Sequence, residues 1–161
     1  MKGLKTFVFA LLLALLGATP VFAESEEGTH HEGGHSFHPN VIAVFTGVTS
    51  ETRRDGSFTL SLEYHRRFTE SFGVGVVAEH VFDDHEFNVV AFPFSWYLGH
   101  WKLFAAPGFE KSDHHDNEFL VRFGAEYAFP VGKFEIAPQV MVDFVEGEEV
   151  FVLGLTFGKA F

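Results

Sequence analysis

Apolar and polar residues alternate with a period of two over long stretches of this chain. In residues 58–65, 119–129 and 134–144, every second residue is apolar, and the residues between them are mostly polar, charged or small. This period is typical of a β-strand with one apolar face. No helical periodicity is found after residue 23, so the pattern predicts an all-β fold.

Seven clusters of turn-forming residues interrupt the alternation at nearly even intervals. They lie at residues 52–56, 67–71, 83–85, 99–100, 112–117, 130–132 and 146–148. The segments between them are about ten to thirteen residues long. A tilted strand of that length crosses the apolar layer of a bilayer, whereas strands of soluble domains are usually about half as long. The sequence therefore predicts eight strands within residues 41–161.

Small residues on the polar face decide which side of the predicted sheet points inward. Alternation alone also fits a soluble barrel with an apolar interior. The polar face, however, carries Gly73, Gly108, Gly124, Ala137 and Gly154, which suit the narrow interior of an eight-stranded barrel. An open edge cannot persist in lipid, so the last strand is expected to pair with the first. The predicted fold is an eight-stranded, up-and-down, antiparallel transmembrane β-barrel.

The residues before the predicted barrel divide into two segments. Residues 1–23 combine Lys2 and Lys5 with an apolar stretch and end in a small-residue cleavage site at Ala23, which predicts a cleaved signal peptide. Residues 24–40 are polar and rich in histidine, with Phe37 as their one large apolar residue. Such a segment has too little apolar surface to order itself, so we expect a disordered periplasmic tail.

The C-terminal residues resemble those of a known class of membrane protein. From Phe151 to Phe161 every second residue is apolar except Lys159. A strand of this kind that ends in an aromatic residue resembles the signal read by the barrel-assembly machinery of Gram-negative bacteria. The whole pattern resembles the small outer-membrane barrels of the OmpA-barrel and OmpX type.

That resemblance implies a location as well as a fold. It places residues 41–161 in the cell outer membrane, in contact with lipid and lipopolysaccharide. Aromatic residues gather beside the shorter turns, as an interfacial girdle does, and this predicts that both termini are periplasmic. Activities vary widely among proteins with porin-like barrels, so the resemblance implies no single function.

The net charge and the lack of cysteine limit which functions and which sources of stability are possible. The chain has a formal net charge of −11 at pH 7 and no cysteine. An acidic balance argues against nucleic acid as a partner, because binding to phosphates needs clustered Lys and Arg. Without cysteine, stability must come from a closed hydrogen-bonded framework or a packed core.

Charged residues on the predicted inner face are the first candidate site. Unpaired charges are costly in a water-poor interior, so these groups must pair or be hydrated. They would form either a polar plug that rigidifies the barrel or a narrow cation-preferring conduit, and eight strands leave no room for a wide pore. The set comprises Glu63, His65, Glu79, Glu110, Arg122, Glu126, Glu135 and Asp143, with Lys102 as a further member.

Histidines of the N-terminal tail are the second candidate site. His30, His31, His35 and His38 alternate with carboxylates, and imidazole with carboxylate suits Zn²⁺, Ni²⁺ or Cu²⁺. The alternative is a flexible tail whose metal affinity is incidental. Acidic, histidine-containing turns at 83–86 and 113–116 are a third candidate, either as a shared divalent-ion site or as solvated tips. No other cofactor is expected.

An enzymatic site is not predicted. Ser61, Glu63 and His65 share one face of a strand and resemble a catalytic set in composition. Alternate residues on a strand are about 6.8 Å apart, which places Ser61 and His65 about 13 Å apart, too far for a nucleophile and its base. We therefore expect a non-enzymatic structural or interaction role in the envelope. The alternative functions are metal handling and narrow cation conduction. Modification of lipid A is the enzymatic alternative.

Overall fold

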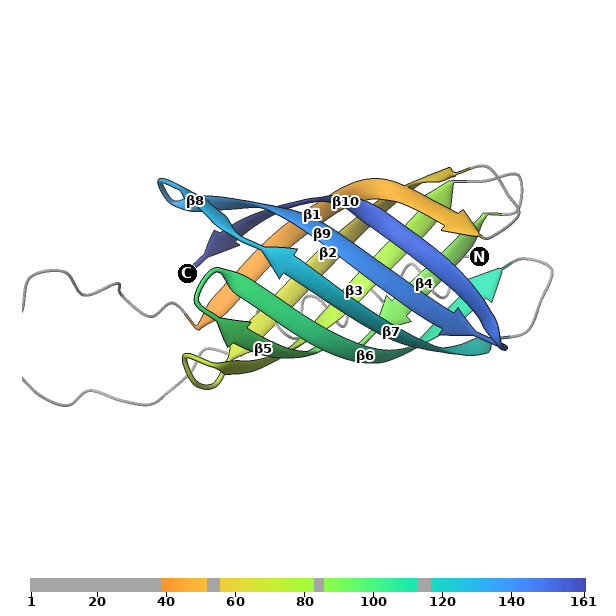
Figure 1. The fold of residues 1–161 in the computed structure, drawn as a ribbon, viewed down its shortest axis with the longest axis horizontal. Coiled ribbons are helices and arrows are strands. Elements are labelled where there is room, and N and C mark those ends of the chain that lie inside the picture. Colours follow the sequence, from red (N-terminus) through yellow and green to blue (C-terminus); the bar gives the residue numbers. More distant parts are fainter. Residues whose placement is uncertain (1–38, 52–55, 83–85, 113–116) are drawn as a thin grey trace, which may run out of the picture. The chain divides into compact units, whose positions relative to one another are not determined.

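A computed structural model of the chain describes residues 39–51, 56–82, 86–112 and 117–161. These residues form one antiparallel sheet that is rolled into a closed barrel (Figure 1). None of them belongs to a helix of the length and apolar character needed to cross a membrane. The strands are β1 (Asn40–Glu51), β2 (Ser57–Arg67), β3 (Phe72–Phe82), β4 (Phe87–Ala91), β5 (Phe94–Leu98), β6 (Trp101–Ser112), β7 (Glu118–Tyr127), β8 (Phe129–Val131), β9 (Phe134–Val145) and β10 (Glu148–Ala160).

The ten strands make eight passes along the barrel wall, which confirms the predicted architecture. Both β4 and β5 pair with β3 and β6, so they are two halves of one pass that is interrupted at residues 92–93. The interruption falls at Pro93, which has no N–H to donate to a neighbouring strand. Its carbonyl still accepts a 2.8 Å hydrogen bond from the Gly75 N–H, which joins the two halves to β3. Likewise, β7 and β8 both pair with β9.

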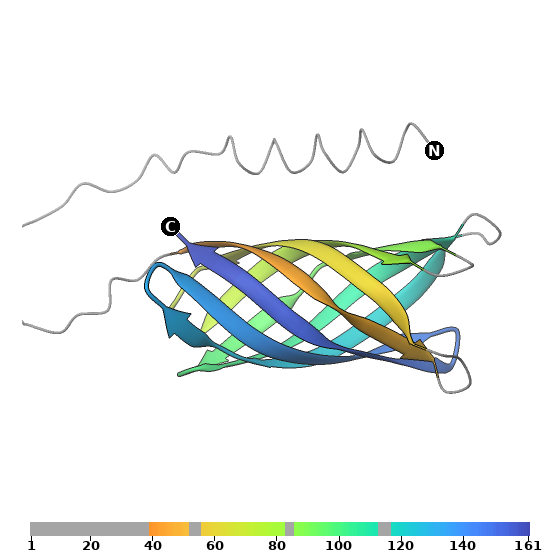
Figure 2. The same ribbon diagram turned by 90° about the horizontal axis from the view of Figure 1, so that it is seen from above.

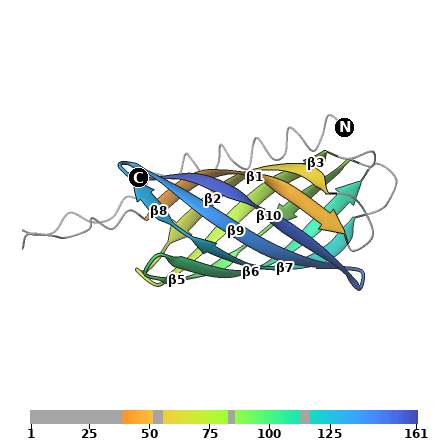
Figure 3. The same ribbon diagram turned by 45° about the horizontal axis from the view of Figure 1, so that its top comes forward.

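Pairing of the first and last strands closes the barrel. The register of β1 and β10 runs from Val41 opposite Ala160 to Glu51 opposite Val150. Beyond it, the Phe161 N–H donates to the Asn40 carbonyl at 2.8 Å, and the Asn40 N–H donates to the Phe161 carbonyl at 3.2 Å. β9, β10 and β1 lie side by side along the wall in Figures 2 and 3. The predicted pairing of the two terminal strands is therefore confirmed.

The turns within the described residues lie where the sequence predicted them, with one small shift. Those predicted at 52–56, 83–85 and 112–117 lie mostly outside the described residues. Pro130 and Val131 extend the hairpin as β8, so the turn that follows is Gly132–Lys133. Glu146 and Gly147 both have positive φ, 50° and 90°, as the two central residues of a type I′ hairpin turn do. Asn40 and Phe161 lie at one end of the barrel with the turns at 68–71, 99–100 and 132–133 (Figure 1). We call this the terminal end and the opposite one the loop end.

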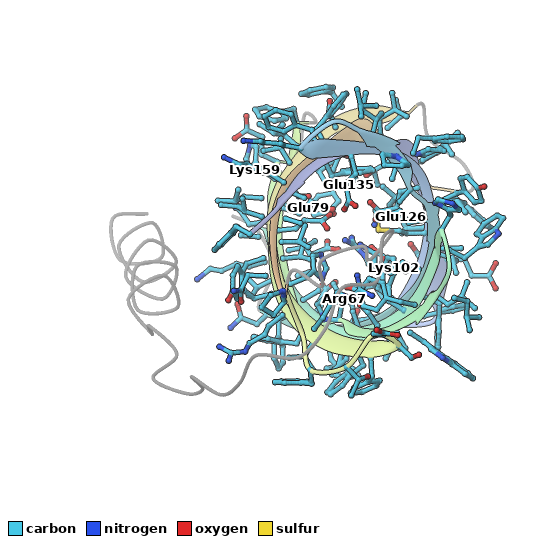
Figure 4. All side chains as sticks on the ribbon, turned by 90° about the vertical axis from the view of Figure 1, so that its left-hand side faces the viewer. Arg67, Glu79, Lys102, Glu126, Glu135 and Lys159 are labelled. Carbon is cyan, nitrogen blue, oxygen red and sulfur yellow. The ribbon has the colours of Figure 1, made fainter. Side chains whose placement is uncertain are left out.

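The outer and inner faces are those that the alternation predicted. Large apolar side chains such as Phe58, Phe119 and Leu153 are exposed on the outside. Their sequence neighbours point inward, where Thr59, Leu120 and Val152 are buried. Figure 4, a view from the terminal end along the barrel, shows the outward aromatic and aliphatic side chains as a ring around the strands. An apolar outer face is what lipid requires of a spanning barrel.

Candidate functional site

Arg122 of β7 is the centre of the largest ion-pair cluster described inside the barrel. Its Nε and Nη2 donate to the two carboxylate oxygens of Asp143 on β9, each at 2.7 Å. Its Nη1 and Nη2 donate to Glu79 on β3 at 3.0 and 2.7 Å. β9 is the strand next to β7, whereas β3 lies farther around the wall. The guanidinium therefore links opposite parts of the wall across the lumen.

All three members of this cluster are buried, and short hydrogen bonds join the one guanidinium to both carboxylates. Arg122 is 1% exposed, and Glu79 and Asp143 are each 4% exposed. Two bidentate contacts use most of the donors of the guanidinium in the planar geometry that carboxylates prefer. The sequence predicted all three residues on the inner face, and the structure brings them together.

Glu63 of β2 lies between two other candidate residues on the same strand. Its Oε2 is 2.9 Å from Nε2 of His65, and its Oε1 accepts a hydrogen bond from Ser61 Oγ at 3.4 Å. The carboxylate thus separates the hydroxyl from the imidazole. Ser61 cannot transfer a proton directly to His65, so the arrangement lacks the nucleophile–base contact of a serine hydrolase.

A third polar cluster lies nearer the terminal end. Lys102 of β6 and Glu126 of β7 are cross-strand partners, and Lys102 Nζ lies 2.6 Å from Glu126 Oε2. Figure 4 shows both side chains, with Arg67 and Glu135, inside the ring of strands. Arg67 ends β2, and its guanidinium lies 4.3 Å from the centre of the Tyr97 ring. The sequence predicts Arg67 in the turn at 67–71, but β2 extends through Arg67.

The remaining predicted members are less enclosed. Glu135 and Glu110 are half-buried and lie toward the terminal end and the loop end, respectively. The predicted inner-face set is therefore not one network: it divides into the Arg122 cluster, the Glu63 cluster and the Lys102–Glu126 pair, with the other two glutamates nearer the mouths.

Apolar side chains fill much of the lumen between these clusters, in contrast to the predicted inner face. One cluster of buried residues is Phe45, Phe104, Met141 and Val152, and another contains Val77, Val89, Ala91, Ala106, Leu120 and Val145. The expected lining was polar or small. Alternation predicts which residues point inward, but it does not exclude large apolar residues where they pack against each other.

The inner glycines make room for two of these side chains, the rings of Phe45 and Phe104. A methyl group added at Gly47 or Gly154 would lie 2.6 Å from Cζ of Phe45, and one added at Gly124 would collide with the ring of Phe104. Small residues were correctly predicted on the inner face, yet the space they leave is occupied by aromatic side chains. A cavity of about 10 Å³, lined partly by His65 and Met141, remains beside them and has room for about one water molecule.

Several neutral polar residues complete the lining and were missed as site members. Thr49 and Thr59 hydroxyl oxygens are 2.5 Å apart, and Thr156 donates to the side-chain oxygen of Gln139. Gln139 also contacts Met141 Sδ at 3.3 Å. Alternation already predicts these residues on the inner face, but the predicted site contained only ionisable groups.

Both predicted metal sites lie wholly or mostly outside the described residues. This applies to His30, His31, His35 and His38 and to most of the turns at 83–86 and 113–116. Within the described ranges, no three His, Asp or Glu side chains are grouped closely enough to hold a metal ion.

The barrel is similar to solved outer-membrane barrels at low sequence identity. The N-terminal β-barrel domain of Pseudomonas aeruginosa OprF aligns with a TM-score of 0.54 and 12% identity, over 78% of this chain and 100% of that one. Ail, the attachment invasion locus protein of Yersinia pestis, aligns with a TM-score of 0.51 and 14% identity, again over 78% and 100%. The chain has the fold of the small eight-stranded outer-membrane barrels.

This fold does not by itself carry an activity. A de novo designed transmembrane β-barrel aligns with a TM-score of 0.52 and 11% identity, over 75% of this chain and 95% of that one. No protein-family model and no curated protein sequence matches the chain. The similarity therefore confirms the resemblance inferred from the strand pattern at the level of fold, and function must be argued from the residues.

Proposed function

We propose that this chain is an integral outer-membrane barrel with a closed lumen, which acts as a structural or interaction protein of the cell envelope. The observation that carries the proposal is the Arg122 cluster, which ties β7 and β9 to β3 across the interior. Buried aromatic and aliphatic residues pack beside it. A lumen filled in this way supports rigidity rather than transport.

Electrical recording tests the closed lumen directly. The refolded chain, inserted into planar lipid bilayers, is expected to leave the membrane current at baseline. A pore-forming protein reconstituted in the same lipid is the positive control. Small discrete conductance steps that change in a Glu126→Gln variant would contradict the proposal and favour the narrow cation-preferring channel.

A non-enzymatic role is part of the same proposal. Glu63 separates Ser61 from His65, so the residues that most resembled a catalytic set lack the required contact. Assays for deacylation or other modification of lipid A should therefore show no turnover.

The proposed orientation places the terminal end in the periplasm and the loop end at the cell surface, beside lipopolysaccharide. This orientation puts Phe161 where the barrel-assembly machinery is expected to meet it. Metal handling by His30, His31, His35 and His38, with Zn²⁺, Ni²⁺ or Cu²⁺, remains a separate prediction that does not depend on the lumen.

Deleting Phe161 should lower the amount of assembled barrel in outer-membrane fractions several-fold. Phe161 exchanges two backbone hydrogen bonds with Asn40 and is the expected assembly signal. Heat-modifiable electrophoretic mobility of the barrel would measure assembly. Deleting residues 24–34 is the control and should leave assembly near wild type; equal losses in both variants would contradict the assigned role of Phe161.

A further inference from the structure

Three polar side chains form a row on the outer face of β3, β4 and β6. The strand register places His80 opposite Asn88, and Asn88 opposite Lys111. The preceding residue on β3, Glu79, points into the lumen, so His80 points outward. Asn88 and Lys111 are exposed, and His80 is half-buried. We call these three residues the outer polar row.

The outer polar row lies at the loop end of the barrel. His80 is two residues from the end of β3, Asn88 is the second residue of β4, and Lys111 is the penultimate residue of β6. Large apolar residues flank the row on the outside, among them Leu60 and Phe109, which are 41% and 51% exposed. In the orientation proposed above, the row lies at the boundary between the acyl chains and the headgroups of the outer leaflet.

The hydrogen bonding within the row leaves an excess of donors. His80 Nδ1 and Asn88 Oδ1 are 3.0 Å apart, and because an amide oxygen only accepts, the imidazole N–H is the donor. The His80 ring also packs edge-on against Phe82, with centroids 4.3 Å apart. Asn88 keeps the two N–H groups of its side-chain amide. Lys111 adds an ammonium group that has no ion-pair partner among the described residues.

A donor-rich row that includes one ammonium group at a lipid boundary suits an anionic ligand with many acceptors. Polar groups that face lipid are costly unless they are hydrogen-bonded, so a partner for these donors would stabilise the assembly. Phosphate oxygens accept from lysine ammonium groups, and carbonyl and hydroxyl groups accept from amides. A phosphorylated glycolipid offers all of these acceptors in one headgroup.

We propose that the outer polar row binds the phosphorylated headgroup of lipid A in the outer leaflet. The inference rests on the proposed outer-membrane function, because it requires that the loop end face the cell surface. Lys111 would pair with a phosphate, and Asn88, held by His80, would donate to a neighbouring carbonyl or hydroxyl oxygen of the same headgroup.

Lipid binding by the full refolded chain in detergent micelles tests the proposal. Purified lipid A would be titrated, and the lipid-bound fraction measured by native mass spectrometry. A variant with Asn88→Leu and Lys111→Leu should bind about tenfold more weakly, since each basic residue near anionic lipid contributes about fivefold and the lost amide contact adds to it. Replacing lipid-facing polar residues by leucine should leave the barrel folded.

The matched control is Lys159→Leu, because Lys159 is also an exposed outward lysine but lies at the terminal end. It should change lipid A binding by less than about twofold. Lipid A without its phosphates should bind wild type and the double variant more nearly equally. Equal weakening by both sets of substitutions, or wild-type affinity for phosphatidylglycerol equal to that for lipid A, would overturn the assignment.

Failure of this inference can be distinguished from failure of the proposed function. If the chain inserts into bilayers without carrying current, and the double variant binds lipid A as wild type does, the outer polar row is not the site and the closed barrel stands. If the chain does not insert into bilayers, both proposals fail.

Discussion

Replacing Arg122 with methionine should destabilise the barrel by about 3–5 kcal/mol, because it leaves two buried carboxylates without their partner. Glu79 and Asp143 would face each other across the lumen with no cation between them. The free energy of unfolding would be measured by urea titration of the barrel in lipid vesicles. Fluorescence of Trp96 and Trp101, both on the outer face, reports the loss of the lipid-inserted state.

A triple variant provides the control for this experiment. Combining Arg122→Met with Glu79→Leu and Asp143→Leu removes every charge of the cluster, and replacement of a complete buried network is often neutral or stabilising. The triple variant should therefore recover most of the lost stability. If the single variant were as stable as wild type, the two carboxylates would have to be hydrated or protonated without their partner, and the assigned role of the Arg122 cluster would be contradicted.

An arginine at Val140 should cost about 2–4 kcal/mol of stability, because it would place a charge near the middle of the bilayer. Val140 lies in the middle of β9, is 52% exposed and points outward from the barrel. The same urea titration in vesicles would measure the change in free energy of unfolding.

The same substitution at the rim is the control. Val131 is also exposed, at 54%, but it adjoins the turn at Gly132, where an arginine can reach the aqueous interface. Val131→Arg should therefore cost only about 0–1 kcal/mol. Equal costs at the two positions would mean that the outer face does not meet a bilayer at the expected depth.

The fold could be predicted from the sequence because the limits and the two faces of each strand are visible in the residues of that strand alone. Alternation is local, so the outward direction of Phe119 and the inward direction of Arg122 follow from the residues beside them. Turn chemistry is local too, and it located the Glu146–Gly147 turn. The division of one pass into β4 and β5 was not predicted, although Pro93 was its visible cause.

The contacts within the lumen could not be predicted in the same way. Arg122 meets Asp143 through the register of two neighbouring strands, but its contact with Glu79 joins strands that are not neighbours and depends on the tilt and curvature of the closed barrel. The filling of the lumen by Phe45 and Phe104 was also missed. Gly124 lies opposite Phe104 on the neighbouring strand, whereas Gly154 meets the Phe45 ring only because β10 closes onto β1. Alternation therefore predicts the inner-face set but not its division into clusters.

The pairing of β1 with β10 suggests the order in which the strand pairs form during folding. Most other strand pairs join neighbours in sequence, whereas Val41 and Ala160 come from opposite ends of the barrel sequence. Closing a loop of that length costs about 2 kcal/mol more in chain entropy than closing a hairpin, because each doubling of length adds about 0.6 kcal/mol. High contact order of this kind slows folding. The β1–β10 seam should therefore form last, and thermal fluctuations that part the wall sideways into the lipid should begin there.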